Sequence, residues 1–146
     1  MNASNQAWVH PVARILLGAL FFISGISKLL AFAGTVGYMT KFGVPMPEVL
    51  AALTIAVEIG ASFLLIIGFK ARIAALVLAI FVAIITPIFH GYWDVDPAQY
   101  GNQFNHFWKN ITIIGGMLYV FAIGAGAFSV DARRQAGSGR ANTSLA

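Results

Sequence analysis

The feature that most limits what this chain can fold into is the arrangement of its apolar residues in four long blocks. They cover residues 15–32, 49–69, 73–89 and 111–128, and each is almost free of charged side chains. A helix rises about 1.5 Å per residue, so blocks of this size suit the roughly 30 Å hydrocarbon core of a bilayer once interfacial ends are added. Membrane strands would be shorter and would alternate apolar with polar residues. The pattern predicts an all-α, polytopic membrane protein, built as an antiparallel four-helix transmembrane bundle.

Composition supports one membrane domain with polar ends. The chain is 59% hydrophobic and only 10% charged, which exceeds the apolar share of soluble domains. We expect the domain to cover residues 12–131, with spans at about 13–33, 48–69, 72–90 and 108–128. Residues 1–11 and 132–146 are small or polar, so we expect both to be disordered cytoplasmic segments.

Basic residues lie at the ends of the apolar blocks. The side that carries both termini has Arg14, Lys70, Arg72, Arg133, Arg134 and Arg140. The opposite side has Lys28, Lys41 and Lys109 together with Glu48, Asp94 and Asp96. The positive-inside rule therefore predicts cytoplasmic termini. Nucleic acid is excluded as a partner, because the basic residues form no single patch interleaved with exposed aromatic residues.

The absence of cysteine limits the possible functions, and a possible signal-peptidase site raises the question whether the first helix is cleaved. The sequence has no cysteine, which excludes disulfides, thiol relays, iron–sulfur ligation and cysteine zinc sites, so any redox role needs a borrowed cofactor. Ala31-Phe32-Ala33 has the form of a signal-peptidase site, but Lys28 interrupts the approach to it. We expect the first helix to be retained, with a cleaved signal as the alternative.

Small residues recur every four positions in two blocks that a short connection makes neighbours. The runs are Ala52, Ala56 and Gly60 in the second block, and Ala71, Ala75, Ala79 and Ala83 in the third. Small residues on one face let helices approach closely in lipid. We expect these two faces to pack, although alanine is also simply common. Around residues 38–42, before two prolines, we expect a short interfacial helix.

Glu58 is the most informative residue, because it lies near the middle of the second block. Thr54 and Ser62 lie four residues to either side of it, which places all three on one helical face that must point inward. A carboxyl group in lipid is costly and its pKa is tunable. We interpret Glu58 as the catalytic candidate, a proton carrier. The alternative is that Glu58, protonated or paired, only holds helices together.

Lys28 and Arg14 lie on one face of the first block, together with Ser24 one turn before Lys28. From the ends of the blocks, Lys28 lies ~6 Å and Glu58 ~15 Å below the outer surface. The offset of about 9 Å indicates that a direct pair would need helix tilt or a bridging water. The alternative for Lys28 is that it extends to the outer interface. Arg14 is expected as a structural charge that meets loop or headgroup groups at the inner surface.

The outer end of the bundle is expected to hold a polar cluster. His90 ends the third block, and His106, Lys109 and Asn110 precede the fourth, after an outer loop expected over residues 91–107. With Lys28, these residues are the candidates for binding a cofactor. The alternative is that both histidines are polar residues at a wet boundary. Haem ligation by the two histidines, or a metal shared with Glu58, is not required by the spacing, and we predict no metal site.

The residues resemble the DoxX family of small four-helix inner-membrane proteins over nearly all of residues 12–131. Each motif is weak alone, and their order and spacing together carry the resemblance. The matching pieces are Arg14-Ile-Leu-Leu-Gly18, Ser24-Gly-Ile-Ser-Lys28, Glu58-Ile-Gly60, Gly68-Phe-Lys-Ala-Arg72, His90, Phe107-Trp-Lys-Asn110, Gly115-Gly116 and Gly126-Ala-Phe-Ser-Val-Asp131. The resemblance implies a multi-pass protein of a bacterial inner (plasma) membrane, tied to quinone-linked oxidoreductase systems and oxidative-stress complexes. It implies no known reaction for this member.

The first hypothesis is a membrane component of a redox system, with the lipid bilayer as surroundings and a redox enzyme subunit or a second copy as partner. The cofactor is unknown, with a quinone as the first candidate and haem as the second. Lys28, His90 and Asn110 would contact the ring oxygens of a quinone, and Glu58 would carry protons. Alternatives from other classes are a pathway for a small solute or protons, and a non-catalytic scaffold for a larger enzyme.

Overall fold

The computed structural model describes the backbone of residues 7–143 and the side chains of residues 7–137, and all regular structure in this part of the chain is helical. This confirms the all-α class. The helices are α2 (Val9–Leu30), α3 (Phe32–Lys41), α4 (Pro47–Ile67), α5 (Ala71–His90), α6 (Pro97–Ile123) and α7 (Val130–Thr143). Of the predicted N-terminal segment 1–11, residues 1–6 lie outside the described residues and Val9 already belongs to α2.

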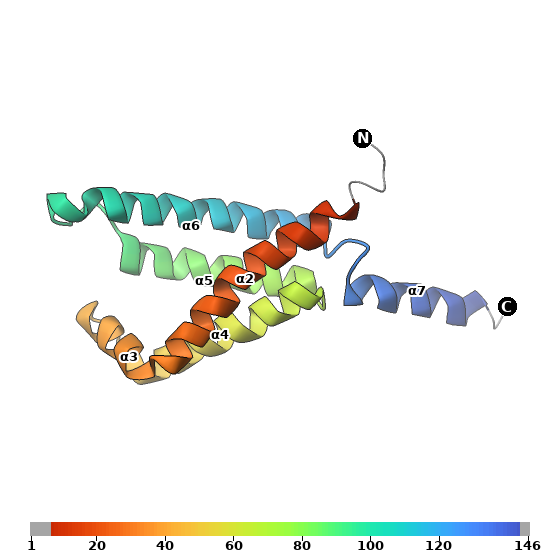
Figure 1. Ribbon diagram of the computed structural model, residues 1–146, viewed down its shortest axis with the longest axis horizontal. Coiled ribbons are helices and arrows are strands. Elements are labelled where there is room, and N and C mark those ends of the chain that lie inside the picture. The colour runs from red at the N-terminus through yellow and green to blue at the C-terminus, as the bar shows by residue number, and fades with distance from the viewer. Residues whose placement is uncertain (1–6, 144–146) are drawn as a thin grey trace.

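Three of the helices, α2, α4 and α5, are long and apolar enough to cross a membrane. The longest helix, α6, is not among them, since its N-terminal part is polar as far as Asn110. Nevertheless α6 packs along α5, and α2 packs along α4 (Figure 1). In Figure 1 the start of α2, the α4–α5 turn and the end of α6 lie together, at the end of the helix bundle from which α7 extends.

The turn between α4 and α5 is tight because two residues adopt left-handed backbone conformations, Gly68 with φ 70° and Lys70 with φ 48°. The first N–H groups of α5 are then satisfied from far along the chain. The Asp131 carboxylate accepts hydrogen bonds from the Lys70 nitrogen at 2.8 Å and the Ala71 nitrogen at 3.0 Å. An acidic cap at a helix N-terminus satisfies free donors and complements the helix dipole. The segment after α6 is thereby attached to the start of α5.

The prediction that the small-residue faces of α4 and α5 pack on each other is wrong, although three of the four alanines of α5 are buried. Ala71, Ala75 and Ala79 are buried in the core, although Ala83 is exposed. In α4 the expected packing residues, Ala52, Ala56 and Gly60, are all exposed. The buried face of α4 instead carries Ala51, Ile55, Glu58, Ser62 and Leu65. The need to bury the polar groups of Glu58 and Ser62 determines which face of α4 points inward, and Ala52, Ala56 and Gly60 therefore lie on the exposed face.

The close approach between α2 and α4 is made by glycines of α2. A Cβ atom on Gly25 would lie 2.7 Å from Ile59 Cγ1 and 3.1 Å from Glu58 Cβ, and one on Gly18 would lie 2.6 Å from Ile66 Cγ1. Any larger residue at these positions would push the two helices apart. These glycines therefore set the spacing of α2 over α4.

Three segments differ from the sequence-based expectation. Helix α6 begins at Pro97, so the outer loop is much shorter than residues 91–107, because Asp96 caps the helix by accepting from the Ala98 nitrogen at 2.8 Å. The interfacial helix expected at residues 38–42 is longer, since α3 begins at Phe32. The tail expected to be disordered from residue 132 is described as helix α7, with the Ser129 hydroxyl accepting from the Ala132 nitrogen at its start.

Substituting Gly25 by leucine should separate α2 from α4. We expect the free energy of unfolding to fall by about 3 kcal/mol, the upper end of overpacking costs. Gly60→Leu is the matched control, since a Cβ atom there meets nothing within 4 Å. Thermal unfolding of both variants in the same mild detergent measures the difference, and equal stabilities would contradict the close approach at Gly25.

Candidate functional site

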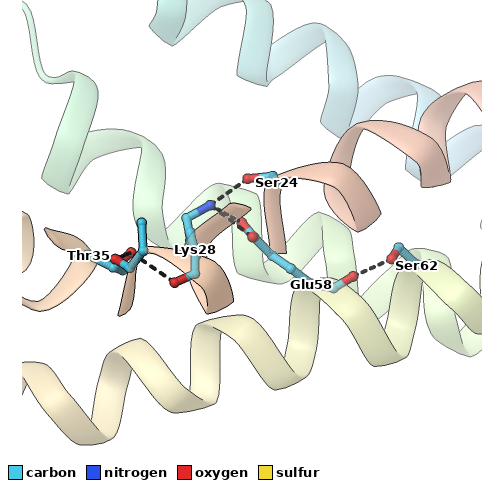
Figure 2. A network of polar contacts seen from close by, with 6 residues as sticks. Ser24, Lys28, Thr35, Glu58 and Ser62 are labelled. Atoms are coloured by element: carbon cyan, nitrogen blue, oxygen red, sulfur yellow. Dashed lines mark hydrogen bonds and ion pairs between the residues drawn. The ribbon is translucent and has the colours of Figure 1, made fainter. Parts of the chain in front are cut away.

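The centre of the candidate site is an ion pair between Lys28 of α2 and Glu58 of α4. Lys28 Nζ lies 2.9 Å from Glu58 Oε1 and 2.8 Å from Glu58 Oε2, so it meets both oxygens of the carboxylate. Figure 2 shows the two side chains reaching across the helix interface, with Lys28 also donating to the Ser24 hydroxyl on its own helix. Two residues that are 30 positions apart in the sequence thus share one polar contact.

The direct pair corrects the estimate that the two groups lie about 9 Å apart in depth. That estimate treated the outer ends of the two helices as level, whereas α2 ends at Leu30 and its Gly25 lies opposite Glu58 and Ile59. A helical side chain also leans toward the N-terminus of its helix. Lys28, one turn beyond Gly25, therefore extends back to Glu58 without a bridging water.

Burial of the pair is unequal. The Glu58 side chain is 4% exposed and the Lys28 side chain 31% exposed. The Ser62 hydroxyl, one turn further along α4, is fully buried and donates to the Glu58 carbonyl oxygen. Thr54, expected on the same inward face, is only partly buried and lines an apolar groove instead. The exposed surface of the ion pair therefore lies almost entirely on Lys28.

A second polar cluster joins the end of α5 to the first part of α6. The rings of His90 and His106 stack with centroids 4.9 Å apart, and His90 Nδ1 lies 2.9 Å from Gln103 Oε1. Lys109 Nζ lies 2.9 Å from His106 Nδ1, where a neutral ring nitrogen accepts. Burial, followed by the charges of Lys109 and His90, lowers the pKa of His106 from its ordinary value. This environment favours a neutral His106.

The remaining cofactor candidate, Asn110, has a partner of its own. Its side-chain nitrogen donates to the Thr86 hydroxyl at 3.0 Å, and that hydroxyl donates to the Val82 carbonyl at 2.6 Å, all in the buried α5–α6 interface. Within the described residues, no hydrogen bond or ion pair joins Lys28 or Glu58 to His90, His106, Lys109 or Asn110. The same part of the chain has no group of three His, Cys, Asp or Glu residues able to hold a metal. The expected single cluster is therefore three separate ones.

Arg14 lies at the other end of α2 and is almost fully buried, with 3% of its surface exposed. Its guanidinium donates to three carbonyl oxygens: Ile66 at 3.3 Å, Ala125, and Phe128 at 3.0 Å. Carbonyls at helix C-termini lack partners within the helix and carry negative partial charge. Arg14 therefore joins the end of α4 to the segment after α6, as a loop contact and not a headgroup contact.

Sequence reasoning did not identify Gln103 or Asp131 as partners in these clusters. Gln103 could have been found from Asp96 and Pro97, an N-cap and first-turn signal that starts α6 early and places Gln103 one turn before His106. Asp131 ends the last of the matching sequence motifs, but its role as a cap for α5 depends on a long-range contact that no local pattern encodes.

These features define a small helical membrane protein whose helix interface holds a buried ion pair. The protein-family model of DoxX matches residues 10–91. The chain is 39% identical over 123 residues to the inner membrane protein YphA of Escherichia coli, covering 84% of this chain and 87% of the relative. It is 38% identical over 120 residues to the E. coli inner membrane protein YqjF, covering 82% and 87%. The chain belongs to the DoxX family.

A more distant match is to the Surfeit locus protein 4 homolog of Schizosaccharomyces pombe, 31% identical over 80 residues, which are 53% of this chain and 26% of that protein. No solved structure matches the chain. The family model covers the residues that build the ion pair, Ser24, Lys28 and Glu58, together with Arg14 and His90.

Removing either member of the ion pair should destabilise the protein, and removing both should restore most of the loss. Lys28→Met or Glu58→Met alone leaves one charge without its partner, which we expect to cost about 3 kcal/mol, the low end for buried pairs because Lys28 is partly exposed. The double variant leaves two apolar side chains of similar length. Unfolding of all four proteins in detergent gives the coupling energy, and simple addition of the two single losses would contradict the pair.

The pKa of His106 should rise when Lys109 is replaced by glutamine, because a positive charge that disfavours ring protonation is removed. The ring would then gain its proton at a higher pH than in the parent protein. Nuclear magnetic resonance titration of the His106 ring protons measures this, with Lys41→Gln, at the far end of α3, as the control. An unchanged His106 titration in Lys109→Gln would contradict the contact.

Proposed function

We propose that the protein is the quinone-facing membrane component of a redox system, with the Lys28–Glu58 pair as its proton-exchanging centre. The observation that carries this proposal is the bidentate contact at 2.8 and 2.9 Å inside apolar helices, of which only the Lys28 side remains accessible. Ionisable groups inside membrane helices are costly and tend to persist for function. The family membership and the inner-membrane relatives agree with such a location.

The architecture that we propose is an antiparallel four-helix transmembrane bundle in which α6 is the fourth span beside α2, α4 and α5. The packing of α6 along α5 and the apolar residues of α6 beyond Asn110 support a fourth crossing. Both termini would be cytoplasmic, because the α4–α5 turn with its basic residues, and α7 with the tail arginines, lie at the end where α2 starts (Figure 1). The bundle would cover residues 12–131 of a bacterial inner-membrane protein.

In this proposal the pair binds the ring of a quinone and moves protons. The Lys28 ammonium group donates a hydrogen bond to a ring oxygen while the Glu58 carboxylate behind it keeps the charge balanced. The Ser24 hydroxyl, already in contact with Lys28 Nζ, is the neighbouring group that can hold the ammonium in place. A bound quinone would supply the redox chemistry, with electrons delivered by a partner enzyme.

The residues proposed here to contact a quinone ring differ from those expected from the sequence, which were Lys28, His90 and Asn110. Asn110 donates to Thr86 within the helix interface, and His90 contacts Gln103 and His106. In the part of the chain that the structure describes, no hydrogen bond or ion pair joins either residue to Lys28, so the proposed ring contacts are Lys28 and Ser24 on α2. His90, His106 and Lys109 form the polar end of the α5–α6 pair, where we propose exchange of protons with the outer aqueous phase.

The competing function is a structural one, in which the ion pair only fastens α2 to α4 in a scaffold. The close packing at Gly25 beside Glu58 favours this reading, because the pair lies where the two helices already touch. The two functions differ in what the double variant Lys28→Met/Glu58→Met should do. If the ion pair is only structural, the double variant keeps its activity, because apolar packing replaces the pair. If the pair contacts quinone and carries protons, the double variant loses its activity.

Quinone binding is tested by extracting the protein in mild detergent, supplying ubiquinone or menaquinone, and quantifying bound quinone by mass spectrometry. We expect the parent protein to bind quinone, and Lys28→Met/Glu58→Met to bind at least tenfold less while remaining folded. Lys41→Gln, which alters an exposed lysine outside the pair, should bind as the parent does. A parent protein that binds no quinone under these conditions would refute the proposal, and a double variant that binds normally would assign the pair to the scaffold.

A further inference from the structure

A long apolar groove follows the outside of the α4–α5 interface. One section, of about 390 Å³, runs from Phe89 and Met39 at the α3 end to Val57 and Val77. A second section, of about 330 Å³, shares Val57 and Val77 and continues to Ile73. The two sections therefore form one path along the two helices. The second section is lined in part by small residues, Ala56, Ala61 and Ala74.

The groove opens into a polar pocket at the α4–α5 turn. This pocket has a volume of about 560 Å³, and Lys70 and Ile73 line both it and the groove. Arg72 lines the pocket as well, with its guanidinium donating to the Phe121 and Ala122 carbonyls near the end of α6. An apolar channel that ends at a polar, basic cavity matches the shape of a molecule with one hydrocarbon chain and a charged head.

The charged residues in and near the pocket determine whether it favours a positive or a negative head group. Arg134 lies close by, since its guanidinium carbon and Lys70 Nζ lie 5.2 Å and 5.8 Å from the centre of the Phe69 ring. The acid that lines the pocket, Asp131, has both carboxylate oxygens occupied by the backbone nitrogens of Lys70 and Ala71. The cations Lys70, Arg72 and Arg134 thus outnumber the acid, so the pocket favours a negative group.

We propose that this groove and pocket bind an anionic phospholipid, with an acyl chain in the groove and the phosphate beside Lys70. The phosphate accepts hydrogen bonds from the Lys70 ammonium group, and Arg72 and Arg134 add long-range attraction. A free phosphate or sugar phosphate would leave the groove empty and would gain nothing from its apolar walls. The site lies on the outside of the α4–α5 pair, so it stands independently of the role of Lys28 and Glu58.

The test is a native mass spectrometry titration of the full chain, freed of lipid in mild detergent. Phosphatidylglycerol and phosphatidylcholine with the same acyl chains are added separately. We expect phosphatidylglycerol to bind several-fold more tightly. Lys70→Gln should weaken it about fivefold, from the attraction of one cation at a membrane surface, and leave phosphatidylcholine unchanged. Lys70→Arg, which keeps the charge, should bind as the parent protein does.

The groove is tested separately with Ala56→Trp, which fills its wall and should weaken both lipids. Ala52→Trp, on the same helix and exposed outside the groove, is the matched control, and Lys41→Gln is the control for charge. Glycerol phosphate added in excess should not displace the lipid. Equal affinity for the two lipids, equal losses in Lys70→Gln and Lys41→Gln, or displacement by glycerol phosphate would each overturn the proposal.

Discussion

The structure depends on one constraint: a charge carried into a membrane by an apolar helix must be satisfied by the chain itself. Glu58 imposes this constraint on α4, and Lys28 of α2 satisfies it with contacts of 2.8 and 2.9 Å. The side chains can meet because Gly25 lets the two backbones approach. The position of α2 on α4 thus follows from this polar contact, and the spacing of the two helices follows from the glycines beside it.

The same constraint governs the other end of the helices, where backbone groups need partners. Arg14 donates to carbonyls at the end of α4 and after α6, and Arg72 donates to the Phe121 and Ala122 carbonyls near the end of α6. Asp131 supplies the opposite charge to the start of α5. Three sequence motifs that look unrelated therefore meet as one set of helix-end contacts.

The sequence predicted the helical class, the positions of α2, α4 and α5, and the inward face marked by Glu58 and Ser62, because those follow from local apolar blocks and helical period. It did not predict which partner each polar side chain would choose. Counting residues from the outer end of each helix places Lys28 and Glu58 too far apart in depth. The relative position of two helices along their axes depends instead on where glycines such as Gly25 allow contact. The small residues of α4 were assigned to the wrong face for the same reason: alanine spacing does not specify a partner, whereas a buried carboxylate does.

Function at this interface requires that the pair exists in a bilayer as a charged contact. Solid-state nuclear magnetic resonance of the full chain in liposomes, with ¹⁵N-labelled lysine and ¹³C-labelled glutamate, measures this directly. A charged pair predicts a measurable dipolar coupling between Lys28 Nζ and the Glu58 carboxyl carbon, one of whose oxygens lies 2.8 Å from Nζ, and a chemical shift of an ionised carboxylate. Absence of that coupling, with Glu58 protonated and facing lipid, would contradict it.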